Sequence, residues 1–209
     1  MTDKDRDWKS IRHALYEAIG GFAACLAVTL TLFFEVVVLR GTCGEDSFVE
    51  ASQVSMLFLS SVVFLKTALR HRDIAGGMVL IGGFLMCMAI RELDWVTDRL
   101  AHGSWVFFAL AAAAFFIRLA VKNKETLVHG LAVFARSRAC PFMMTGLLCV
   151  LVFSRLFGSK YIWYTLYDVE RVRILKNVVE EGLEMFGMAL ILTSSIMQLA
   201  AEGLSESRD

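Results

Sequence analysis

Residues Ile74–Ile90 read IAGGMVLIGGFLMCMAI, seventeen consecutive residues without a charge. The hydrocarbon core of a bilayer is crossed by about 17–25 mostly apolar residues in helical form. The run is too long and too continuous for a transmembrane β-strand, which alternates in polarity over about ten residues. Its small residues, among them Gly76 and Gly83, recur seven positions apart, and this spacing favours close contact between helices. The sequence here therefore predicts a membrane-spanning helix with close neighbours.

Five further stretches, on either side of this one, are similarly long and apolar. The fourth span of the six has Arg118 near its end, where a long side chain can reach the membrane surface. The fifth begins with Pro141, which is tolerated in the first turn of a helix. The six expected spans are residues 18–39, 53–69, 74–90, 105–121, 141–157 and 172–201. An even number of spans places both termini on the same side of the membrane.

The composition supports a membrane protein. Of the 209 residues, 57% are hydrophobic, and the mean hydropathy is +0.60, whereas soluble domains are about 45–50% apolar. The 21 basic residues only balance the 21 acidic ones, so the chain lacks the basic surplus that binding to nucleic acid requires. We therefore predict an all-α fold, a polytopic bundle of six transmembrane helices that forms a single domain over residues 1–209.

The segment between the fourth and fifth spans has a different pattern. Residues 125–138 alternate apolar side chains such as Leu127 and Leu131 with charged ones such as Arg136. Spacing of this kind is typical of a helix that lies in the membrane interface. We expect such a helix on the same side as the two termini.

Basic residues indicate the orientation, because cytoplasmic loops of membrane proteins are enriched in Lys and Arg. Thirteen of the 21 basic residues fall on the side that carries both termini, and the other eight fall on the opposite side. We therefore expect both termini in the cytoplasm. The acidic residues divide the other way, since twelve of the 21 lie on the outer side.

Several of the outer acidic residues lie within membrane depth. Glu35 is one turn from the outer end of the first span, and Glu184 is inside the sixth. A carboxylate at the centre of a span costs about 2.5–3.5 kcal/mol, so such groups normally face the bundle interior and meet a partner. On a helix Glu180 and Glu184 share one face. Glu181 lies beside this pair, and Lys176 precedes Glu180 by one turn.

A second polar group follows the outer end of the third span. Its members recur at intervals of three, four and four residues and are Arg91, Asp94, Asp98 and His102. If the helix continued beyond the span, these side chains would form one polar stripe. Glu92 adjoins this group, and Glu50 lies in the loop before the second span.

We expect these groups to meet in a pocket just below the outer membrane surface, built from the ends of spans one, two, three and six. Clustered carboxylates repel one another unless a cation neutralises them, which is typical of a metal site or an acid–base pair. The expected acid–base and supporting residues are Glu35, Glu50, Arg91, Glu92, Asp94 and His102. The expected metal ligands are Glu180, Glu181, Glu184 and Asp98. Carboxylates suit Mg²⁺, Mn²⁺ or Ca²⁺ better than Zn²⁺, which prefers histidine and cysteine.

Three short segments carry a resemblance to a known group of proteins. They are Glu45-Asp46-Ser47-Phe48-Val49-Glu50 followed by Gln53, Arg91-Glu92-Leu93-Asp94-Trp95, and Glu180-Glu181-Gly182-Leu183-Glu184. In this layout the chain resembles a family of uncharacterised bacterial six-helix inner-membrane proteins with acidic motifs at the outer helix ends. That family often has two adjacent acids where this chain has Arg91-Glu92. The resemblance implies the bacterial inner membrane and brings no activity with it.

Three functions are compatible with this layout. The first is an outward-facing carboxylate site, in a metal-dependent enzyme or a binder, for a lipid-linked or periplasmic substrate; a bound metal would activate water beside a lipid head group. The second is a non-enzymatic partner or scaffold protein, whose acids stabilise helix packing or dock a periplasmic subunit. The third is cation transport, because a carboxylate-lined vestibule attracts cations. A continuous path through so short a chain would require a homo-oligomer.

Overall fold

The computed structural model describes residues 3–41, 43, 47–99, 101, 103–165 and 169–206, and the side chains of these residues apart from 3, 6, 9, 164, 169–171 and 202–206. Within this part of the chain every regular element is a helix, which confirms the all-α bundle. The elements are α1 (Asp3–Phe33), η1 (Phe34–Val38), α2 (Phe48–Arg70), α3 (Ala75–Glu92), α4 (Asp94–Thr97), α5 (Trp105–Lys122), α6 (Lys124–Ala135), α7 (Cys140–Leu148), η2 (Cys149–Phe153), α8 (Ser154–Phe157), α9 (Lys160–Tyr164) and α10 (Val169–Glu206).

Six helical segments are long and apolar enough to cross a membrane, so the chain is a multi-pass membrane protein. They are Ser10–Val38, Phe48–Arg70, Ala75–Glu92, Trp105–Lys122, Cys140–Phe157 and Val172–Ala201. The largest difference from the prediction is in the first helix, which begins at Asp3 rather than near Ala18. The polar residues before the span contain neither glycine nor proline, so nothing in them interrupts the helix.

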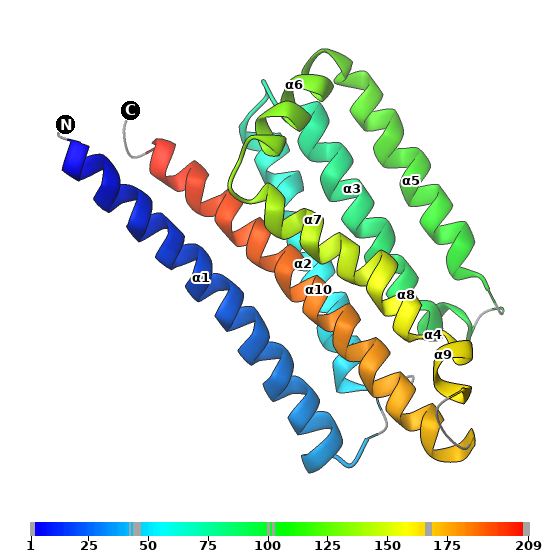
Figure 1. The fold of residues 1–209 in the computed structure, drawn as a ribbon. Coiled ribbons are helices and arrows are strands. Elements are labelled where there is room, and N and C mark those ends of the chain that lie inside the picture. The colour runs from blue at the N-terminus through cyan, green and yellow to red at the C-terminus, as the bar shows by residue number, and fades with distance from the viewer. Residues whose placement is uncertain are drawn as a thin grey trace.

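Two helices, α3 and α10, occupy the centre of the bundle. α10 packs against α1, α2 and α7, and α3 packs against α2, α5 and α6. Figure 1 shows α1 and α5 on opposite sides of the bundle, and both of them expose most of their length to the surroundings. α1 begins and α10 ends at the same end of the bundle, the end at which α6 lies (Figure 1). We call the opposite end, where α4 and α9 lie, the far end.

The small residues of α3 lie where its neighbours come closest, as their spacing predicts. At Gly82 the Ser61 hydroxyl of α2 donates a hydrogen bond to the glycine carbonyl at 2.8 Å. Gly83 lies against the Phe116 ring of α5. A Cβ atom on Gly77 would lie 2.5 Å from the backbone nitrogen of Leu131 in α6. Glycine is therefore what allows three different helices to approach α3 closely.

The helix expected between spans four and five is present as α6, although it ends at Ala135 rather than near Arg138. It packs against the beginning of α3, where the Thr126 hydroxyl accepts a hydrogen bond from the Gly76 amide at 3.0 Å. Its Phe134 ring meets the Phe64 ring of α2 edge to face, with centroids 5.4 Å apart. These contacts fix α6 across one end of α3.

The helix α3 ends at Glu92 and does not continue into the following polar residues. Leu93 has φ −91° and ψ 20°, and a separate short helix, α4, starts at Asp94. The expectation of one helix that aligns the polar residues after the third span is therefore wrong over the described positions 91–99. The break redirects the chain after Glu92, so Asp94 and Asp98 lie in different surroundings.

Candidate functional site: a carboxylate pocket

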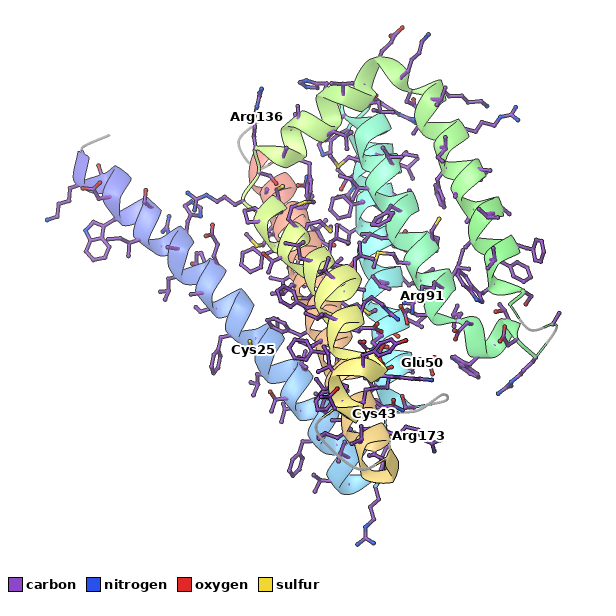
Figure 2. The ribbon with its side chains drawn as sticks, turned by 45° about the vertical axis from the view of Figure 1, so that its right-hand side comes forward. Cys25, Cys43, Glu50, Arg91, Arg136 and Arg173 are labelled. Carbon is purple, nitrogen blue, oxygen red and sulfur yellow. The ribbon has the colours of Figure 1, made fainter. Side chains whose placement is uncertain are left out.

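A polar cavity of about 220 Å³ lies toward the far end of the bundle, where α2 begins and α3 and α8 end against α10. It is lined by Cys43, Glu50, Arg91, Glu92, Asp94, Arg155, Asn177, Glu180, Glu181 and Glu184. Figure 2 shows Cys43, Glu50 and Arg91 in the half of the bundle away from Arg136, which follows α6. We call this cavity the carboxylate pocket.

Three of the carboxylates come from α10. Glu184 is only 3% exposed, and it accepts a hydrogen bond from the Ser154 hydroxyl at 3.1 Å. The same carboxylate forms an ion pair with Arg155 of α8. The Arg155 guanidinium also lies 3.6 Å from Glu180, which pairs with Lys176 at 2.7 Å. Arg155 therefore spans one turn of α10 and ties α8 to it.

The third of these carboxylates, Glu181, is held by α2. The fully buried Gln53 donates from Nε2 to Oε2 of Glu181 at 3.0 Å and to the Glu181 backbone carbonyl at 3.3 Å. Among the described residues, none donates a hydrogen bond to the buried Gln53 Oε1 atom. A buried acceptor without a donor costs about 1–3 kcal/mol. This acceptor belongs to the same amide group that donates to Glu181.

The remaining acids come from the beginning of α2 and the end of α3. Glu92 is buried and forms an ion pair with its neighbour Arg91. Asp94 opens α4. Glu50 is in the first turn of α2, where the Ser47 hydroxyl accepts a hydrogen bond from the Glu50 amide at 3.2 Å. This N-cap fixes where α2 begins, and it thereby positions Glu50 at the pocket.

The carboxylate pocket carries more negative than positive side chains. Six of its lining residues are acids and two are arginines, and Lys176 adds a third cation through its pair with Glu180. If all of these described groups were ionised, the acids would outnumber the cations by three. Like charges at close range are strongly unfavourable where the dielectric constant is low. A bound cation or bound protons would therefore relieve repulsion among these acids.

Glu35 does not line the carboxylate pocket. It lies in the π-helical turn η1, is buried, and accepts a hydrogen bond from the Phe48 amide at 3.0 Å. That amide is among the unsatisfied donors in the first turn of α2, where a carboxylate also interacts favourably with the helix dipole. Glu35 therefore caps α2. Span five, through Arg155, takes the place in the pocket wall that was expected for span one.

Cys43 is supplied by the loop between η1 and α2, and its side chain is buried in the pocket wall. Burial raises the pKa of the Cys43 thiol, and the negative charges of Glu35 and Glu181 act in the same direction, to about 11. The thiol is therefore protonated at neutral pH. Cys43 contributes a neutral surface to the pocket and no further negative charge.

One other predicted residue, Asp98, is not brought into the pocket. Asp98 accepts a hydrogen bond from the Gly103 amide at 2.8 Å, which holds the loop before α5. His102 lies outside the described residues, as do Glu45 and Asp46. A contact between His102 and the pocket stays a prediction.

The expected metal ligands do not form a metal centre in the described structure. Among the described residues, no group of three or more His, Cys, Asp or Glu side chains is arranged to hold a metal ion. Glu180 and Glu184 are engaged by Lys176 and Arg155, and Asp98 contacts the loop before α5. Metal binding by the four expected ligands therefore stays a prediction.

Four residues of the site were not predicted from the sequence. They are Ser154, Arg155, Asn177 and Cys43. A signal for the first two was present, because they form an adjacent polar pair near the end of an otherwise apolar span. Asn177 lies four residues before Glu181, and this spacing places both on one face of α10.

No protein-family model matches the chain, and neither a curated protein nor a solved structure matches it significantly. The resemblance to bacterial six-helix inner-membrane proteins stays an expectation. The functional assignment therefore depends on the residues of the carboxylate pocket themselves.

Proposed function

We propose that the carboxylate pocket binds the cationic group of a lipid-linked or periplasmic ligand, in a bacterial inner-membrane protein with both termini in the cytoplasm. The observation that supports this function is the charge imbalance of the pocket, with six acids against two arginines and Lys176. The excess of basic residues on the side of the termini supports the orientation. In that orientation the far end of the bundle faces the periplasm.

The size of the pocket suits a small organic cation. Its volume of about 220 Å³ is that of about seven water molecules, at roughly 30 Å³ each. An ammonium group donates up to three hydrogen bonds, and charge-assisted bonds to carboxylates are the strong ones. A bound cation also relieves the repulsion among the acids. Arg91 and Arg155 hold three of the acids in place through ion pairs.

A purely structural role of the acids is the second candidate, and specific contacts favour it. Glu184 joins α10 to Ser154 and Arg155 of α8, and Glu181 joins α10 to Gln53 of α2. In this alternative the chain is a non-enzymatic partner or scaffold protein. The two candidates differ in how the protein responds to an added cation.

Butylammonium distinguishes the two candidates. We expect it to raise the melting temperature of the full-length protein in a neutral detergent, whereas butanol, which has the same chain and no charge, should not. The Glu181→Gln variant keeps an acceptor for Gln53 and removes one charge. Because a hydrogen bond to a charged group contributes about 1.5–3 kcal/mol, this variant should bind butylammonium roughly ten- to a hundredfold more weakly.

The Glu17→Gln variant is the matched control. Glu17 pairs with Arg138 at 3.0 Å, outside the pocket, so this variant should respond to butylammonium as the wild type does. A structural role predicts another outcome, in which butylammonium stabilises none of the proteins and Glu181→Gln only lowers the melting temperature. That outcome would contradict the proposed function.

A further inference from the structure

We infer that the carboxylate pocket is one half of a longer site that holds an amine-bearing lipid of the surrounding bilayer. The amine occupies the pocket, and one acyl chain occupies an apolar cavity between α3 and α7. This inference rests on the proposed function, because it names the class of ligand that carries the cationic group.

The second half of the site is a cavity of about 510 Å³ between α3 and α7, with α6 at one end. We call it the apolar groove. The side chains that define its walls include Phe84, Leu85, Phe134, Met143, Met144 and Leu147. Phe84 is 44% exposed and Met144 is 47% exposed, although both lie within membrane spans. The groove therefore opens toward the hydrocarbon of the bilayer.

The apolar groove and the carboxylate pocket follow one another along the same two helical walls. On α3 the groove residue Leu85 precedes the pocket residue Arg91 by six positions, which is about 9 Å along a helix. On the other wall Leu147 precedes Arg155 by eight positions, or roughly 12 Å. On α3 the buried Met88 lies between Leu85 and Arg91. Its flexible thioether side chain can adapt to a bound acyl chain.

The order of polarity along these walls is that of a lipid. The polar groups lie toward the far end, and the apolar groups extend from the middle of α3 and α7 to the beginning of α7 and to α6. With the far end facing the periplasm, a lipid of the outer leaflet has its head and its chain in the same order. At roughly 30 Å³ per group, the volume of a water molecule, the groove holds on the order of fifteen methylene groups.

The carboxylate pocket also has both signs of charge that a zwitterionic head group requires. Its carboxylates suit an ammonium group. The side chains of Arg91 and Arg155 are 38% and 48% exposed despite their ion pairs, and a guanidinium group binds phosphate well. A phospholipid with an amine therefore complements the pocket better than an anionic lipid does.

Lipid retention tests the inference directly. Full-length protein is released for native mass spectrometry from nanodiscs with equal amounts of phosphatidylethanolamine and phosphatidylglycerol of the same chains. We expect the protein to retain phosphatidylethanolamine about tenfold more than phosphatidylglycerol. Met144→Trp narrows the mouth of the groove and should remove this preference, while the protein still binds butylammonium. Leu147→Trp, deeper in the groove, provides a second variant if the first does not fold.

The Leu110→Trp variant is the control, because Leu110 is 62% exposed on α5 and does not line the groove. It should retain lipid as the wild type does. Equal retention of the two lipids, or unchanged retention in both groove variants, would overturn the inference and leave the proposed function standing if butylammonium still binds. If native mass spectrometry instead shows a dimer without bound lipid, a second copy of the chain occupies the groove. That result would also overturn the inference. Failure of butylammonium to bind would remove the proposed function as well.

Discussion

Arg155 is the residue that connects most of the carboxylate pocket. It pairs with the buried Glu184 and lies 3.6 Å from Glu180, so it meets two of the three carboxylates of α10. A buried charge that loses its partner is strongly destabilising. Because the Arg155 side chain is 48% exposed, water screens part of this interaction.

We predict that Arg155→Gln lowers the stability of the full-length protein by about 1–3 kcal/mol, because it leaves Glu184 buried without its cation. The double variant Arg155→Gln with Glu184→Gln should recover part of the loss, since it also removes the uncompensated charge. Melting temperatures in detergent measure both effects. A double variant whose loss equals the sum of the two single losses would show that the two residues act independently.

The sequence predicts the acidic residues within the membrane spans better than it predicts the residues that pair with them. The spacing of Glu180 and Glu184 places them on one face of a helix, and the pocket contains both. Arg155 comes from another span, so its contact with them requires the tertiary packing of α8 against α10. Glu35 was correctly expected to be buried, but the π-helical turn η1 directs it to the Phe48 amide instead of the pocket.

At the scale of elements, the closest approach between α7 and α10 occurs at two glycines. A Cβ on Gly187 would lie 2.6 Å from the Gly146 carbonyl oxygen and 2.6 Å from Cγ2 of Val150. Both distances are far below van der Waals contact, so any side chain there pushes the helices apart. This contact brings α8, the continuation of α7, to the acids of α10.

We predict that Gly187→Ala destabilises the protein by about 1–3 kcal/mol through overpacking. Gly21→Ala is the matched control, because its Cβ would lie 3.9 Å from the Phe142 ring, an ordinary contact. Alanine is favoured over glycine within a helix by about 1 kcal/mol, so the control should be neutral or more stable. In detergent the melting temperature should therefore fall for Gly187→Ala and stay unchanged or rise for Gly21→Ala, and an equal fall in both variants would contradict the packing described.

Hydropathy predicts the spans themselves because membrane length and apolar composition are local properties of the chain. The hydropathy pattern is a poorer guide to the residues at which helices begin and end. The first helix starts at Asp3 because its polar arm stays helical, and α3 stops at Glu92 although charged residues follow at helical spacing. Whether a helix continues past the membrane depends on the loops that follow, and these have no comparable pattern.

At the scale of the whole molecule, the proposed orientation determines which compartment the pocket faces. We predict that alkaline phosphatase fused to the C-terminus is inactive and that a fluorescent protein fused there is fluorescent, because both report a cytoplasmic end. Phosphatase fused after Ser159, in the turn between α8 and α9 at the far end, should be active. An active C-terminal phosphatase fusion would place the carboxylate pocket on the cytoplasmic side.

The neutral composition of the chain conceals two oppositely charged ends. Basic residues predominate at the end with the termini, and acidic residues predominate at the other. The fold collects six of those acids in one cavity, and among the described residues three cations, Arg91, Arg155 and Lys176, pair with acids there. The remaining negative charge is what the bound cation is proposed to neutralise.

Isothermal titration of butylammonium into the full-length protein tests this proposal most directly. We predict saturable binding of one butylammonium per chain to the wild type and to Glu17→Gln, and binding at least tenfold weaker to Glu181→Gln. Absence of saturable binding to the wild type, or equal affinity in Glu181→Gln, would contradict a cation-binding role of the carboxylate pocket.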